Sequence, residues 1–116
     1  MSQPREQGSV LDDVVVKRLR DLRAQVQRPG EDMLGDLVAL FERDSALRLD
    51  ALRAASTATA RRQAAHALKG SAANLGAAQV AALALVIERS PEAAADVDTL
   101  ASAVRRAIAE LRTRLA

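Results

Sequence analysis

Residues 64–76 read AAHALKGSAANLG, and this stretch decides how the chain folds. Its apolar members recur at three- and four-residue spacing, at Ala65, Leu68, Ala72 and Leu75. That spacing is the period of one face of an α-helix, so the stretch predicts a helix with a single apolar face. Gly76 follows directly and is expected to end the helix, because glycine readily adopts the left-handed conformation of a helix C-cap.

The same period recurs on both sides of this stretch. We expect helices over residues 10–26, 31–54, 58–75, 78–88 and from about 91 to 115. Ser9 is the candidate N-cap of the first helix, with the acid Asp12 three residues later, and Pro91 is expected in the first turn of the last helix. In the first helix the expected inward stripe is Leu11, Val14 or Val15, Arg18, Leu22 and Val26.

Each helix has one apolar face, and the connections between helices are short. These features favour an all-α fold, an antiparallel up-and-down four-helix bundle with an additional N-terminal helix. A chain of 116 residues corresponds to one domain, which we expect over residues 10–116 after a flexible tail at 1–9. Because alanine is abundant and Phe41 is the single aromatic residue, the core should be thin and alanine-rich.

Composition excludes several kinds of site. The chain has no cysteine and one histidine, so a disulfide framework, a thiolate zinc site and a histidine metal cluster are ruled out. No leader peptide or apolar membrane span is apparent, which predicts a cytoplasmic protein without a membrane partner. The net charge is only +2, and arginines alternate with acids. An arginine-rich nucleic-acid binder is therefore an open but disfavoured alternative.

The single histidine, His66, lies on the predicted outer face of the central helix. At 100° per residue, Arg62, His66, Lys69, Gly70 and Ala73 fall within about 100° of one another, on the side away from the apolar row. A glycine inside a helix costs about 1 kcal/mol relative to alanine, so its presence in an alanine-rich helix requires a reason. Clearance for a partner or a phosphoryl group beside the imidazole is such a reason.

An exposed imidazole is a competent nucleophile, because it is mostly neutral near pH 7. Lys69, one turn on, could pair with phosphoryl oxygens, and Arg62, one turn back, could assist. The sequence places no acid, second histidine or serine triad near His66, and it has no glycine-rich nucleotide loop. A nucleophile without these groups indicates a carrier, to which a partner protein supplies the remaining chemistry.

Residues 66–76 resemble the motif of histidine-containing phosphotransfer (HPt) domains. That motif reads His-x-Leu-Lys-Gly, two small residues, two variable residues, an apolar residue and Gly, and nearly every fixed position is filled here. The preceding helix is also similar to the family pattern, with Leu37, Phe41, Asp44 and Leu52 in place. The resemblance spans about residues 11–115.

The resemblance implies a phosphorelay function. His66 would be the phospho-acceptor, through Nε2, Lys69 would steady the phosphoryl group, and Gly70 would give clearance for the partner. Arg62, Gln63 and Ala73 are candidate assisting residues. The partners would be response-regulator receiver domains, which supply Mg²⁺, and a hybrid histidine kinase.

The chain itself is expected to bind no cofactor or metal, to act as a free-standing monomeric phosphocarrier rather than an enzyme, and to bind no nucleic acid. The alternative is a silent HPt-like adaptor or dimerisation module that keeps the fold without using the histidine.

Overall fold

The computed structural model describes residues 10–92 and 96–116, and every regular element in those residues is an α-helix. The helices are α2 (Asp13–Val26), α3 (Met33–Ala54), α4 (Ala58–Asn74), α5 (Ala78–Arg89) and α6 (Val97–Arg114). The expected tail at 1–9 and the candidate cap Ser9 lie outside the described residues.

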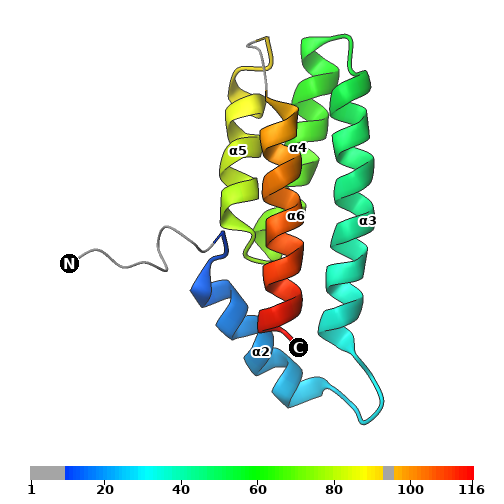
Figure 1. Cartoon of the computed structure of the whole chain (residues 1–116), viewed down its shortest axis with the longest axis vertical. Coiled ribbons are helices and arrows are strands. Elements are labelled where there is room, and N and C mark those ends of the chain that lie inside the picture. Colours follow the sequence, from blue (N-terminus) through cyan, green and yellow to red (C-terminus); the bar gives the residue numbers. More distant parts are fainter. Residues whose placement is uncertain (1–9, 93–95) are drawn as a thin grey trace, which may run out of the picture.

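Four helices stand side by side, and α2 crosses the lower end of the bundle obliquely (Figure 1). Helices α3 and α5 run upward in this view, and α4 and α6 run downward. Each of the four contacts two neighbours, in the closed order α3, α4, α5, α6. The predicted all-α bundle with an additional N-terminal helix is confirmed.

The core is built from leucine, valine and alanine. Four leucines of the described residues are fully buried. One lies on α3, one on α4 and two on α6: Leu34, Leu68, Leu100 and Leu111. Alanines without any exposed surface lie between them, on α4, α5 and α6: Ala65, Ala72, Ala84, Ala103 and Ala107. Phe41 is buried among these residues, so the expected alanine-rich core is confirmed.

The predicted inward stripe of the first helix is confirmed at Leu11, which is buried, but it is wrong over most of its length. Val14, Leu22 and Val26 are exposed, whereas Val16 is fully buried and Leu19 packs against the core. Three consecutive valines at 14–16 fit more than one helical register, so periodicity alone did not distinguish them. The tertiary contacts select the register that buries Val16.

The last helix begins later than expected. Pro91 lies in a turn, and α6 starts at Val97 after the N-cap Asp96. The Asp96 carboxylate accepts hydrogen bonds from the Thr99 backbone N–H at 2.9 Å and from the Thr99 hydroxyl. An Asp cap satisfies the free N–H groups of a first turn, which Pro91 cannot do.

The end of α4 has the geometry that residues 64–76 predict. Gly76 has φ +76°, Gly76 N–H donates to the Ala73 carbonyl, and Ala77 N–H donates to the Ala72 carbonyl. This pattern is a Schellman motif. The chain before α2 attaches here, because Asp12 N–H donates to the Gly76 carbonyl at 2.6 Å and Gln79 N–H donates to the Val10 carbonyl. The turn that ends α4 is thereby fixed on both sides.

We expect Gly76→Ala to destabilise the fold more than Gly30→Ala. Both glycines have positive φ, +76° and +85°, which costs an alanine roughly 1–2 kcal/mol. A Cβ at Gly76 would also lie 3.0 Å from Cβ of Val15 and 3.2 Å from the Asp12 carbonyl oxygen, whereas a Cβ at Gly30 meets nothing within 4 Å. Urea unfolding of the two variants measures the difference, and equal losses would contradict the close packing at Gly76.

Candidate functional site

His66 lies near the middle of α4 with 68% of its side chain exposed. The other residues expected on this face are also accessible. Arg62, Gln63, Gly70 and Ala73 are exposed, and the Lys69 side chain is 31% exposed. The structure therefore brings His66, Lys69 and Gly70 together on one surface, and it records no bond from Arg62 or Gln63 to His66 in the described residues.

A carboxylate from α5 binds both His66 and Lys69. Oε2 of Glu88 lies 2.6 Å from Nδ1 of His66, and Oε1 of the same carboxylate lies 2.6 Å from Nζ of Lys69. The expectation that no acid stands near His66 is wrong. Glu88 is 22 residues away in sequence, and only the antiparallel packing of α4 against α5 brings it to the site.

The height of Glu88 along the bundle, relative to His66, could have been found from the turn. His66 lies ten residues before Gly76 and Glu88 twelve residues after it, so two antiparallel helices joined at Gly76 place them at similar heights. Ile87 is buried in the structure, so its neighbour Glu88 lies at the border of the α5 core face.

The environment lowers the pKa of Glu88 below its ordinary value of 4.5. The main cause is the hydrogen bond from Lys69, followed by that from His66, and partial burial opposes both. Glu88 is therefore ionised at neutral pH. An ionised carboxylate can only accept hydrogen bonds, so Nδ1 donates to Glu88, and in the neutral ring the lone pair is then on Nε2.

A pH series can test this arrangement. Because folding lowers the pKa of Glu88, its ionised form stabilises the fold above pH 4.5, and this contribution is lost as the pH falls through the lowered pKa. We expect wild type to be more stable than Glu88→Gln above pH 4.5, and the difference to shrink at lower pH. Urea unfolding at stepped pH measures it. Glu92→Gln, which removes an exposed carboxylate outside the site, is the control, and a difference constant with pH would contradict the assignment.

Gly70 lies inside α4, four residues before its end. Within the described part of the chain, a Cβ built on Gly70 meets nothing within 4 Å, apart from its own helix. Packing within the chain therefore does not explain this glycine, and the space beside it faces solvent. Gly70 therefore destabilises α4 relative to alanine at a position where the helix surface is open, one turn from His66.

A shallow groove of about 530 Å³ lies on the α3 side of the same helix. Its lining is mostly apolar. It comes from α2, α3, α4 and the C-cap residue of α4: Leu19, Leu37, Leu40, Phe41, Asp44, Ser71, Asn74 and Leu75. Asp44 fixes one wall, because it accepts a hydrogen bond from the Ser71 hydroxyl at 2.9 Å and pairs with Arg48 at 3.4 Å. Leu40 is 55% exposed, so the groove presents an apolar surface to solvent.

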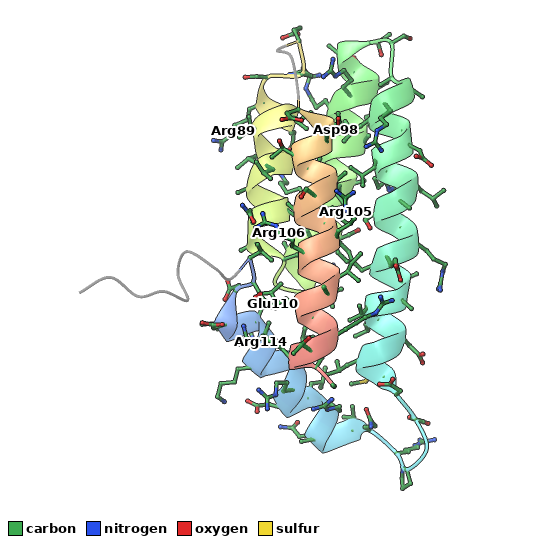
Figure 2. The ribbon with its side chains drawn as sticks, viewed as in Figure 1. Arg89, Asp98, Arg105, Arg106, Glu110 and Arg114 are labelled. Carbon is green, nitrogen blue, oxygen red and sulfur yellow. The ribbon has the colours of Figure 1, made fainter. Side chains whose placement is uncertain are left out.

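The opposite side of the molecule has a mixed charge. Figure 2 shows Arg106, Glu110 and Arg114 along α6, with Arg89 on α5. Arg106 donates to Oε1 of Gln79 at 2.9 Å, and Arg114 pairs with Asp13 at 2.7 Å. Arg106 and Arg114 therefore bind neighbouring elements of the bundle.

A helical bundle with one accessible histidine midway along a helix defines a class of small carrier domains. The family model of the Hpt domain matches residues 36–114, and the chain belongs to that family. Hpt domains are phosphocarrier modules that transfer phosphoryl groups through a histidine in phosphorelays and interact with response-regulator receivers.

Comparison with curated proteins and with solved structures gives no match. Across the described ranges 10–92 and 96–116, none of the helices combines the length and apolarity needed to cross a bilayer.

Proposed function

We propose that this chain is a free-standing histidine phosphotransfer protein, in which Nε2 of His66 accepts a phosphoryl group from, and returns it to, the aspartate of a receiver domain. The observation that carries the proposal is the exposed imidazole beside an open helical glycine, with Nδ1 bonded and Nε2 free of any recorded partner in the described residues.

The transfer balances without an added proton. The Nε2 lone pair attacks phosphorus, an N–P bond forms, and the P–O bond to the partner's aspartate breaks and leaves its carboxylate. The ring keeps its hydrogen on Nδ1 and becomes cationic, which offsets part of the phosphoryl charge. The reverse step regenerates neutral imidazole, so the chain acts as a carrier and not as a hydrolase.

Lys69 is the residue that we propose to steady the phosphoryl oxygens. Its ammonium is 2.6 Å from Glu88, on the Nδ1 side of the ring, so it must leave that carboxylate to reach a group on Nε2. The flexible four-carbon stem of a lysine permits such a movement. Arg62, Gln63 and Ala73, on the exposed face of the same helix, are proposed to contact the partner.

The groove beside α4 is proposed to dock a helix of the receiver. Its apolar lining and exposed Leu40 offer a surface that an amphipathic helix could bury, and its Ser71 and Asn74 wall lies next to Gly70 along α4. The receiver, and not this chain, would hold the Mg²⁺ that balances phosphoryl charge. An upstream hybrid histidine kinase, a cytoplasmic location and a monomeric state complete the proposal.

The second candidate is an HPt-like adaptor that does not use its histidine. It would keep the groove but would not need an open Gly70 or an oriented His66. Because both features are present, we favour the carrier.

Phosphotransfer profiling tests the proposed function. Receiver domains from the source organism are phosphorylated with labelled acetyl phosphate and incubated with the chain. We expect at least one receiver to lose its label quickly to the chain, as an acid-labile and base-stable phosphate. If no receiver in the full set transfers label, the carrier proposal is wrong and the adaptor remains.

A further inference from the structure

We propose that α3 binds a second copy of this chain through its outer row, Leu40, Leu47, Ala51 and Ala54, and forms an antiparallel homodimer. The inference goes beyond the proposed function, in which the single chain is the carrier. The dimer is a second form of the protein that exchanges reversibly with the monomer. Its effect on phosphoryl transfer rests on the proposed function, whereas the association itself does not.

The outer row lies on the face of α3 that points away from the core. Leu40 and Leu47 are 55% and 66% exposed, and the exposed Ala51 and Ala54 extend the row to the end of the helix. The successive spacings of seven, four and three residues are those of the seam between two packed helices. Asp44, which falls in the same row, accepts a hydrogen bond from α4. Within the described residues no other helix covers the row, so it is open to a helix from another molecule.

The charges beside the outer row are self-complementary. Arg43 and Asp50 are exposed on the same flank, seven residues apart, and neither side chain has a recorded bond in the described ranges. In an antiparallel pair the same flank of the two helices meets across the seam, so Arg43 of each copy faces Asp50 of the other. A two-fold axis repeats the contact, and one surface therefore forms two ion pairs with a copy of itself.

The same register covers both exposed leucines. Where the two pairs of charges meet, Leu40 packs against Ala51 of the second copy, and Leu47 lies beside the two-fold axis. The alanine side chains are short, so the two helices can approach closely. A parallel pair is disfavoured, because Arg43 would then face Arg48 of the other copy across the seam. Charge thus selects the antiparallel orientation.

The second copy would occupy one edge of the groove beside α4. Leu40 belongs to both surfaces, because it lines the groove and is part of the outer row. A receiver helix and a second copy of the chain therefore cannot cover Leu40 at the same time. Self-association of the carrier would withhold its docking groove, although His66 itself lies on another helix.

Sedimentation equilibrium of the whole chain tests the association. A contact between two single helix faces is at the small end of protein interfaces, so we expect a reversible dimer with a dissociation constant of about 0.1–1 mM. Arg43→Asp and Asp50→Arg each place like charges opposite one another twice, and each should weaken association by at least about tenfold. The double variant restores both ion pairs and should dimerise as wild type does.

A mixture of the two single variants gives the sharpest result. One chain then has two acids on the flank and the other has two arginines, so all four charges pair only between unlike copies. We expect the mixture to form heterodimers, although neither variant dimerises alone. Arg89→Asp is the control, because it makes the same change of charge on α5, which is diagonal to α3 (Figure 2), and it should associate as wild type does.

The inference and the proposed function can fail separately. A wild type that stays monomeric up to about 1 mM, or single variants that associate as wild type does, would overturn the dimer and leave the carrier intact. A monomeric wild type whose Arg43→Asp variant loses phosphoryl uptake would assign the outer row to the receiver, which also overturns the dimer. If the charge variants behave as expected but no receiver transfers label, the dimer stands and the carrier proposal alone fails.

Discussion

Replacing His66 with glutamine is expected to abolish phosphoryl uptake while the helical bundle stays folded. His66 is the only imidazole in the chain, so no other side chain can form phosphohistidine. Its side chain is 68% exposed, and the glutamine amide can still donate to Glu88, so the free energy of unfolding should change by no more than about 0.5 kcal/mol. Labelled transfer from a receiver and urea unfolding measure the two effects.

Arg105→Gln is the matched control for this variant. Arg105 is exposed on α6, which is diagonal to α4 in the bundle, so it should accept phosphate at the wild-type rate. Label that persists in His66→Gln with the same acid lability would show that His66 is not the acceptor.

Enlarging Gly70 should have the second largest effect and should separate function from stability. Gly70→Gln is expected to raise the free energy of unfolding by roughly 0.5–1 kcal/mol, because glutamine is the better helix former and nothing lies within 4 Å of the new Cβ. The same side chain would fill the space beside His66. Phosphoryl uptake should fall by about 100-fold, since a misplacement of about 1 Å between reacting groups costs that much.

Ala109→Gln supplies the comparison for Gly70→Gln. It adds a similar side chain to an exposed position of α6 and should leave uptake unchanged. Gly70→Ala, with a single added methyl group, should show an intermediate loss. Wild-type uptake by Gly70→Gln would mean that the partner does not approach over this position, and the clearance role of Gly70 would be rejected.

The bundle was predictable because the information for it is local. The apolar row of α4 at three- and four-residue spacing is the row that the structure buries, and Gly76 ends α4 with the expected positive φ. The exposure of the His66 side chain follows from the same helical register. Where one apolar row is unambiguous, periodicity determines which face is buried.

Two parts were not predictable in this way. Valines 14–16 allow more than one register, and the hydrogen bond from Asp12 N–H to Gly76 and the burial of Val16 are tertiary features that the local pattern does not contain. The start of α6 was assigned to Pro91 because proline suits a first turn, but Asp96 satisfies the free backbone N–H groups better.

Glu88 was missed for a different reason. Its role depends on a distance between two helices, and helical periodicity describes one helix at a time. Counting residues from Gly76 gives the position of Glu88 along the axis of α5, but not the direction of its side chain. The 2.6 Å bonds to His66 and Lys69 form only when α5 packs against α4. Site residues that lie on one helix are thus more accessible to sequence reasoning than those that bridge two.

The alanines of the core determine the spacing between α4 and α5, on which the contact from Glu88 to His66 depends. Ala65 and Ala72 on α4 and Ala84 on α5 have no exposed surface, so a longer side chain at these positions would extend into the core. Small-to-large changes at such positions cost about 1–3 kcal/mol and shift the backbone. A shift of even 1 Å between α4 and α5 would break a 2.6 Å contact from Glu88 to His66. Methyl groups with no chemistry of their own thereby act as the spacers that keep His66 and Glu88 aligned, and larger side chains at these positions would disturb the site without altering His66.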